Sequence, residues 1–242
     1  MRYAVFSDIH GNLEALDSVL EKMAEEKPDR YICVGDLVGY GADPNECIRK
    51  VRDIKDCVIV GGNHDYAAAG TLNNGFFNDF AKTAITWTAE QLNNEEKEFL
   101  NKLKLVTTLG NISIAHSNPY LPELFEYIQT SYDLQLGFNM METNLCFIGH
   151  SHVPIFFSLQ RGSISFNTEP TLKVNNSGKF LVNVGSVGQP RDDNPHACYA
   201  IYDDTEKAIS IKRVVYDVDK AISKIRKAGL PEILAERLKH GR

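Results

Sequence analysis

The sequence predicts an α/β fold. Two observations support this: short apolar runs of strand length recur along the chain, and amphipathic helical patterns separate the first of them. The runs are too short and too rich in β-branched residues for helices, and nearly all of them end in turns of Gly, Asp, Asn or His. No repeat, low-complexity tract or linker divides the chain, so we expect residues 1–242 to form one domain.

The N-terminal part of the chain follows the order strand, helix, strand, helix, strand. Apolar residues recur at three-to-four spacing between Leu13 and Met23, Asn12 is a suitable N-cap, and Lys27-Pro28 ends the pattern. A second, shorter helix is expected over residues 45–52, after Pro44. Strands that alternate with helices in this way are expected to be parallel. The predicted strands are 3–6, 31–34 and 57–60.

The remainder is first helical and then rich in strands. Helices are expected over 78–92, 95–104 and 133–141, and strands over 112–115 and 145–148. Beyond Ser151, consecutive strands are separated by turns such as Gln160-Arg161-Gly162 and Asn175-Asn176-Ser177-Gly178, as in antiparallel hairpins. These strands are 154–160, 163–166, 171–174, 180–184, 197–203 and 208–216. A helical tail follows from residue 217 and is interrupted at Gly229-Leu230-Pro231.

Composition excludes several classes of protein. Apolar residues make up 43% and charged residues 24% of the chain, as in a folded globular protein. The formal charge of −6 argues against general nucleic-acid binding. No run approaches the ~18 apolar residues of a membrane span, and the N-terminus lacks the apolar segment of a secretory signal. The five cysteines are widely spaced without C-x-x-C, which favours buried reduced thiols. We therefore expect a cytoplasmic protein without membrane contact.

Eight residues with chemically active side chains lie in the turns after the predicted strands. Five of the seven histidines are among them. In open α/β folds, ligands bind beyond the carboxyl ends of the strands, so residues from separate turns can converge on one crevice. The eight residues are Asp8, His10, Asp36, Asn63, His64, His116, His150 and His152.

The residue types at these turns indicate a metal site. Carboxylate, imidazole and amide oxygen without thiolate suit Mn, Fe, Zn or Mg. Asp8 and His10 are two residues apart, so a strand that continued through them would project both to one side, and His150 and His152 repeat this spacing. Seven candidate ligands exceed the needs of one tetrahedral ion and suit two ions that share a carboxylate. In many enzymes, two metal ions roughly 3.5–4 Å apart catalyse the hydrolysis of phosphate esters.

Each of these residues also has a structural explanation. Asp8 could be an N-cap near the first helix, and Gly35-Asp36 taken alone is more often a turn than a ligand. An isolated histidine such as His196 or His240 is usually a surface or core residue, and we expect no more of those two. The joint occurrence of the turns, each after an apolar run, is what favours a metal site.

Five of the turns also match, in order, the motifs of a known family. Ser7-Asp8-Ile9-His10-Gly11-Asn12 matches D-x-H-G, Gly35-Asp36 with Gly41 matches G-D-x-x-x-x-G, and Gly62-Asn63-His64-Asp65 matches G-N-H-[D/E]. His116 and Gly149-His150-Ser151-His152 match a later single His and G-H-x-H. The chain thus resembles the calcineurin-like metallophosphoesterases. The turns 39–41, 116–119 and 183–191 are similar to those of a prokaryotic branch with diadenosine-tetraphosphatase-like and phosphodiesterase-like members.

The resemblance implies a four-layer αββα sandwich of two mixed sheets flanked by helices, with a dinuclear metal site at the strand ends. It implies that a hydroxide bridging two ions, Mn before Fe, Zn or Mg, attacks phosphorus in line. His64 would be the general acid or electrostatic stabiliser at the leaving group, and Asp65 would orient its ring. The implied ligands are Asp8, His10 and His152 for the first metal, Asn63, His116 and His150 for the second, and Asp36 as the bridge.

One departure from the family pattern bears on the substrate. Protein serine/threonine phosphatases of this superfamily have Asp-Arg where this chain has Gly39-Tyr40, and Glu in place of Asp65. The absence of that arginine argues against a phosphoprotein as the substrate. Arg191 could supply a phosphate-binding guanidinium instead. The side chains of Phe76, Phe77, Tyr120 and Phe125 are expected near the cleft mouth, where core packing is favoured over stacking on a nucleobase.

The favoured activity is metal-dependent hydrolysis of a phosphodiester or phosphoanhydride in a small nucleotide-type substrate, such as a dinucleoside polyphosphate. A phosphomonoesterase, including a protein phosphatase, is the alternative. A non-catalytic scaffold is disfavoured because all seven ligands and His64 are present. An amidohydrolase is disfavoured because the first strand ends in Asp-x-His rather than His-x-His, and because the chain is short for a (β/α)₈ barrel.

Overall fold

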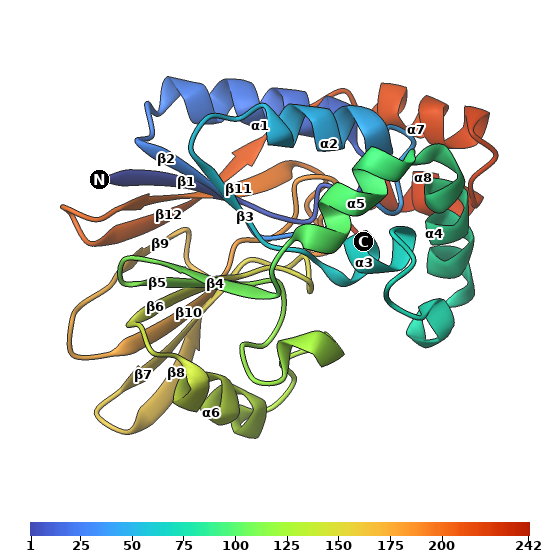
Figure 1. The fold of residues 1–242 in the computed structure, drawn as a ribbon. Coiled ribbons are helices and arrows are strands. Elements are labelled where there is room, and N and C mark those ends of the chain that lie inside the picture. Colours follow the sequence, from blue (N-terminus) through green and yellow to red (C-terminus); the bar gives the residue numbers. More distant parts are fainter.

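Two mixed six-stranded sheets packed face to face form the centre of the fold, which a computed structural model describes over residues 1–242 (Figure 1). The first sheet has the order β3-β2-β1-β11-β12-β9, and β1, β2 and β3 are parallel as predicted. Its strands are β1 Arg2–Phe6, β2 Arg30–Cys33, β3 Cys57–Ile59, β9 Thr171–Lys173, β11 Ala197–Asp203 and β12 Ala208–Val214.

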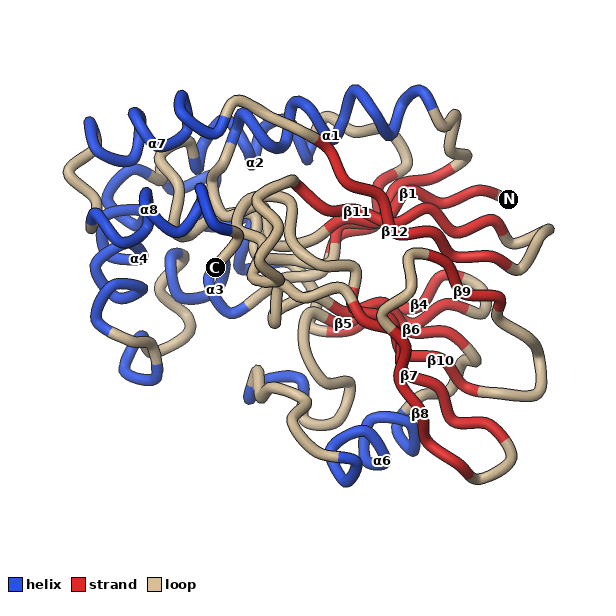
Figure 2. The backbone as a smooth tube through the Cα atoms, turned by 180° about the vertical axis from the view of Figure 1, so that it is seen from behind, coloured by secondary structure: helices blue, strands red, loops and turns tan.

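The second sheet has the order β4-β5-β6-β10-β7-β8. Its three central strands β5, β6 and β10 are parallel, and β4, β7 and β8 run antiparallel to their neighbours. The strands are β4 Val106–Leu109, β5 Ile112–Ala115, β6 Leu145–Ile148, β7 Ile155–Gln160, β8 Ser163–Asn167 and β10 Lys179–Asn183. Figure 2 shows the same sheets from behind, with the first sheet above the second.

Helices cover the outer face of each sheet, which confirms the four-layer sandwich. In Figure 1, α1, α2 and α7 lie above the first sheet and α6 lies below the second. Two short 3₁₀ turns, η1 Asn74–Phe76 and η2 Pro122–Leu124, lie in the loops. The helices are α1 Leu13–Glu25, α2 Pro44–Arg52, α3 Asn63–Ala68, α4 Asp79–Gln91, α5 Asn94–Lys102, α6 Ser131–Met140, α7 Val218–Lys227 and α8 Glu232–His240.

Alternation along the strands separates three apolar layers. In β1, Tyr3 and Val5 pack between the sheets, whereas Ala4 and Phe6 pack under the helices. In β6, Phe147 lies between the sheets and Cys146 lies under α6. Both faces of the central strands are therefore covered, which explains why the sequence shows them as continuous apolar runs. The carboxyl ends of these strands open at one edge, and the candidate residues lie there.

Three parts of the chain differ from the prediction. Strand β4 was not predicted, because its sequence Val-Thr-Thr-Leu (Val106–Leu109) forms no apolar run. Only its pairing with β5 defines it as a strand. Residues 63–68 form helix α3 rather than a turn. The turn at residues 175–178 does not join a hairpin, because β9 belongs to the first sheet and β10 to the second.

Two expectations from composition can be compared with the structure. All five cysteines are free; four are buried and Cys57 is partly buried. None of the helices has both the length and the apolar character needed to span a bilayer.

Candidate dinuclear metal centre

The eight predicted residues come together at the strand ends and are all buried. Side chains from both sheets contribute, since the loops after β1 and β2 belong to the first sheet and those after β5 and β6 to the second. The contributing segments follow β1, β2, β3, β5 and β6, as the sequence predicted. The isolated histidines His196 and His240 are exposed, as expected.

The backbone brings Asp8 and His10 together by a route that the spacing argument did not foresee. Strand β1 ends at Phe6, and both residues adopt left-handed backbone conformations, with φ of 53° and 49°. His150 and His152 do the same, with φ of 67° and 62°. The strand ends at Phe6 as predicted, so the condition under which the spacing of Asp8 and His10 would place them on one side is not met. Their convergence comes from strained loops, which are held by backbone hydrogen bonds such as Asp8 N to Gly35 O (3.0 Å).

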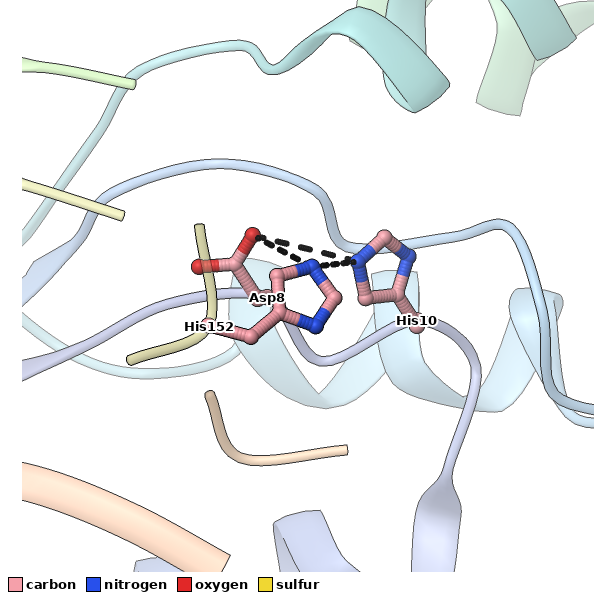
Figure 3. A group of neighbouring side chains, drawn as sticks. All are labelled: Asp8, His10 and His152. Carbon is pink, nitrogen blue, oxygen red and sulfur yellow. Dashed lines mark hydrogen bonds and ion pairs between the residues drawn. The ribbon is translucent and has the colours of Figure 1, made fainter. Parts of the chain in front are cut away.

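Asp8, His10 and His152 form the first group, and Figure 3 shows their side chains converging. His152 Nε2 lies 3.4 Å from Asp8 Oδ1 and 3.0 Å from His10 Nε2. Each Nδ1 faces a backbone carbonyl, that of Val38 for His10 (3.1 Å) and that of Gln189 for His152 (2.6 Å). Because a carbonyl only accepts, the protons must lie on Nδ1. Two Nε2 lone pairs therefore face each other, an arrangement that a bound cation would stabilise.

Asp36, His116 and His150 form the second group, with Asn63 beside it. His116 Nδ1 faces the Val34 carbonyl at 2.8 Å, so its Nε2 is also directed inward. His116 Nε2, His150 Nε2 and Asn63 Oδ1 are buried and have no hydrogen-bond partner. Buried polar atoms without a partner are costly, and these three are potential metal ligands. The residues present thus fit a second cation.

Asp36 lies between the two groups. Its Oδ2 is 3.6 Å from His10 Nε2 and 3.3 Å from His116 Nε2, while its Oδ1 accepts the His64 backbone N–H at 2.9 Å. Gly62 makes this position possible, since a Cβ on it would lie 2.1 Å from Asp36 Oδ1. The glycine of the G-N-H-D motif therefore makes room for a carboxylate.

In the metal-free cluster three of the proposed histidine ligands are neutral, whereas His116 is protonated and would release its proton on binding a metal. Burial lowers the pKa of His150 to about 3 and holds those of His10 and His152 well below their usual value, so these rings are neutral. Burial opposes charge on His116 as well, but the nearby Asp36 and Asp8 carboxylates raise its pKa to about 10. Burial raises the pKa of Asp8 to about 7. Neutral imidazole is the form that ligates metals.

His64 lies beside the ligand groups, with a ring nitrogen within 4.8 Å of ligand atoms of His10 and Asp36, and it also lines the adjoining cleft. Its ring packs edge-on against Tyr40 (4.5 Å between centroids) and Phe77 (4.9 Å). Nδ1 is buried without a partner, which leaves Nε2 as the nitrogen open to the cleft. Burial lowers the pKa of His64 to about 4, with the Arg191 charge as a contributing cause.

Asp65 does not make the contact with His64 that the resemblance implied. Its Oδ1 accepts the backbone N–H groups of Leu37 (2.8 Å) and Val38 (3.3 Å), and its Oδ2 accepts that of Gly62 (3.0 Å). The carboxylate is thus engaged by three backbone donors and ties the loop after β2 to the start of α3. The prediction that Asp65 orients the imidazole through a hydrogen bond is corrected accordingly.

Gly39 fits tightly between the histidines. It has φ of +138°, and a Cβ there would lie 2.6 Å from His64 Nδ1 and 2.8 Å from His10 Nδ1. An aspartate at this position, as in protein phosphatases, would displace both rings.

Gly39→Ala is expected to destabilise the protein by about 1–3 kcal/mol more than Gly70→Ala, the typical cost of overpacking. Gly70 also has positive φ (+86°) but has no atom within 4 Å of the Cβ position, so it controls for backbone strain alone. Thermal unfolding of the two variants measures the difference. Equal losses would contradict the steric role of Gly39.

A cleft of about 670 Å³ opens beside the cluster. Arg191 lines it, as predicted, and its guanidinium stacks over the Tyr40 ring with Cζ 5.6 Å from the centroid. Phe76, Phe77 and Phe125 also line it, whereas Tyr120 does not. Core packing was the wrong expectation for Phe76, which is 93% exposed.

Sequence reasoning also missed Tyr127. This residue lines the cleft and stacks on the His150 ring, with centroids 4.2 Å apart and planes at 22°. It lies in an irregular loop between η2 and α6, where no periodicity or motif marks it. Only the folded loop brings it to the histidine.

Comparisons with known proteins agree with this architecture. Residues 1–207 match the calcineurin-like phosphoesterase superfamily domain. The uncharacterized protein MJ0912 of Methanocaldococcus jannaschii is 42% identical over 243 residues, which cover 99% of this chain and 98% of that protein. A metallophosphoesterase from Sphaerobacter thermophilus superimposes with a TM-score of 0.87 at 37% identity, over 100% of this chain and 99% of that one.

A hypothetical protein, PH1004 from Pyrococcus horikoshii OT3, shares the fold with a TM-score of 0.80 at 21% identity, over 100% of this chain and 98% of that one. The family match covers residues 1–207, and the similarity to the three relatives extends over 99% or more of this chain. The chain therefore belongs to the calcineurin-like phosphoesterase superfamily, and it is a phosphate ester hydrolase.

Proposed function

We propose that the buried cluster holds two divalent ions and that the protein uses them to hydrolyse a phosphodiester or phosphoanhydride. Two observations support this proposal most directly: His150 Nε2 and Asn63 Oδ1 are buried with no protein partner, and the Nε2 atoms of His10 and His152 face each other at 3.0 Å. When bound, the ions would polarise the phosphate oxygens and lower the pKa of a water. The proposed ligands are Asp8, His10 and His152 for one ion, Asn63, His116 and His150 for the other, and Asp36 for both.

His64 is proposed to act at the leaving group. Its Nε2 opens to the cleft, and Tyr40 and Phe77 pack against the ring and limit its rotation. A phosphate in the cleft would offset the Arg191 charge that helps to keep the ring neutral, and so favour the protonated form. His64 would then donate to the leaving-group oxygen, while Asp65 holds the backbone at the start of α3.

The residues that line the cleft favour a nucleotide-type substrate. Arg191 stacks over Tyr40 there, so a phosphate chain would find a cation beside the cluster, although Glu123 and Glu126 also line the cleft. Phe76, Phe125 and Tyr127 offer aromatic faces on which a base could stack. The volume of about 670 Å³ is in the range of small-molecule sites, ~300–1,000 Å³.

The proposed catalytic unit is the whole of residues 1–242, as a single domain. The first sheet supplies the loops of Asp8 and Asp36, and the second supplies those of His116 and His150. Neither sheet alone contains the full set of proposed ligands.

A substrate panel with Mn²⁺ tests the proposed function. We expect turnover of a diadenosine polyphosphate and a simple diester to exceed turnover of a monoester and a phosphopeptide. Preference for the monoester would instead support the alternative, a phosphomonoesterase. His196→Ala replaces an exposed histidine outside the proposed site and should show the same substrate preference as the wild-type protein.

Metal removal has an expected effect on stability. At a metal concentration of about 100 Kd, each of the two ions stabilises the folded state by about 2.7 kcal/mol, so chelation should lower Tm by roughly 11–22 °C for a chain of this size. Differential scanning calorimetry with and without Mn²⁺ measures the shift. An unchanged Tm together with no Mn²⁺-dependent turnover would contradict the proposal.

A further inference from the structure

Two arginines next to the cluster share one amide and have no carboxylate partner. Arg191 Nη2 lies 2.9 Å and Arg237 Nη1 lies 3.4 Å from Oε1 of Gln189. Neighbouring arginines are paired: Arg213 with Asp192, and Arg226 with Glu232 and Glu236. Asp192, the immediate neighbour of Arg191 in the sequence, thus forms its salt bridge with Arg213.

Burial makes this pair of like charges unfavourable on its own. Both guanidiniums are half-buried, and the Nε atoms of both are buried without a hydrogen-bond partner. Gln189 is only 1% exposed and holds the two side chains to a common acceptor. Unpaired charge away from water is costly, and like charges held close together add to the cost. An anion at this position would relieve both effects.

The pair lies beside the first ligand group. The Gln189 carbonyl accepts from His152 Nδ1 at 2.6 Å, and the Arg191 backbone N–H donates to the His152 carbonyl at 3.3 Å. Arg191 lines the cleft and also donates to the Tyr40 hydroxyl (3.3 Å). Arg237 comes from helix α8 and contacts Gln189 Oε1, but unlike Arg191 it does not line the cleft. Helix α8 lies beyond the 207 residues that match the family domain.

The geometry points to Arg191 and Arg237 as a paired-guanidinium subsite for a second phosphoryl group of the substrate, adjacent to the one that is hydrolysed. This inference rests on the proposed function and narrows its substrate to compounds with linked phosphates, such as a nucleoside or dinucleoside polyphosphate. Arg191 contacts the second phosphate with its planar fork, the geometry suited to phosphate oxygens. Arg237 is a positioning residue: it adds positive potential and braces Gln189, to which Arg191 is bonded.

Competitive inhibition by pyrophosphate and by phosphate, at constant free Mn²⁺, tests the subsite. We expect Arg237→Gln to raise the inhibition constant of pyrophosphate about tenfold, which corresponds to about 1.4 kcal/mol. The fold-increase in the inhibition constant of phosphate should be at least three times smaller than that of pyrophosphate, because a single phosphate can bind at the metals without this subsite. Arg237→Lys should recover part of the loss, and Arg191→Ala should have an effect at least as large as that of Arg237→Gln.

Arg226→Ala is the matched control. Arg226 on α7 pairs with Glu232 and Glu236 of α8, so its loss disturbs the same helix without removing a guanidinium from the subsite. Equal effects of Arg226→Ala and Arg237→Gln would show a merely structural role for Arg237 and overturn the inference. Equal rises in the two inhibition constants for Arg237→Gln would overturn it as well.

The failure of the subsite can be told apart from failure of the proposed function. If wild-type protein with Mn²⁺ hydrolysed no phosphate ester, the proposed function would fail, and the subsite would be judged by calorimetric titration of Mn²⁺-loaded protein with pyrophosphate. Weaker binding to Arg237→Gln than to Arg226→Ala would then support the subsite, and equal binding would overturn it. If the wild-type protein hydrolyses the substrate but Arg237→Gln leaves the ratio of the inhibition constants of pyrophosphate and phosphate unchanged, only the subsite fails.

Discussion

Asp36→Asn is expected to release both proposed metal ions and to lower phosphodiester turnover about a thousandfold or more, which is roughly 4 kcal/mol of lost transition-state stabilisation. The reason is its position. Asp36 is the one carboxylate that belongs to a ligand group with His10 and to another with His116. The asparagine removes the negative charge that both ions would share and places a neutral amide there.

Metal content after dialysis, measured by elemental analysis, checks this expectation. Wild-type protein should hold close to two ions per chain. Asp8→Asn is an informative comparison, because Asp8 belongs to the first group alone and its loss should deplete one ion before the other. Glu98→Gln, an exposed acid on α5, should leave the content unchanged. Circular dichroism reports whether Asp36→Asn is folded, and a folded variant that retains both ions would refute the shared-carboxylate assignment.

The sequence was sufficient to predict the layers and most of the elements. Strands β5, β6 and β11 have the predicted bounds, because each is buried on both faces and its apolar run ends where the backbone turns away from the sheet. The convergence of residues from five turns was also predictable, since parallel strands end at one edge. Edge strand β4 was not, because its sequence forms no apolar run and none of its residues is fully buried.

Local geometry in the cluster could not be predicted from residue spacing. A period of two assumes extended backbone, whereas Asp8 and His10 are left-handed and converge only because the loops after β1 and β2 are bonded to each other. His150 and His152 have the same spacing but belong to different ligand groups. Asp65 was misassigned for a related reason: the motif specifies the residue, but the fold decides which donors surround it.

Residues that come from distant segments were the hardest to foresee. Arg237 lies more than forty positions from Arg191 and outside the motif region, and only the packing of α8 brings it to Gln189. The overall charge of −6 likewise gave no sign of a local cationic site. Two divalent ions would bring that total to −2, with all of the added charge inside one cleft, where it acts on the substrate.

His64→Ala is expected to keep both ions and to lower turnover by about 10²–10⁴, the usual contribution of general acid–base catalysis. The size of the loss should depend on the leaving group. A nitrophenolate leaves without a proton and needs His64 least, whereas a more basic phenolate or alkoxide needs it most.

Rates for p-nitrophenyl and phenyl esters of the same phosphate therefore provide the measurement. His64→Gln separates two contributions, since an amide can donate a hydrogen bond but cannot transfer a proton at neutral pH. If the ring only stabilises charge, Gln should recover much of the activity on both esters. If it transfers a proton, Gln should not restore the rate on the phenyl ester, whereas the nitrophenyl ester should lose little activity in either variant. A loss of metal in His64→Ala, or equal losses on both esters, would contradict a role at the leaving group, because Nε2 would then be acting on the metal cluster or on phosphate binding instead.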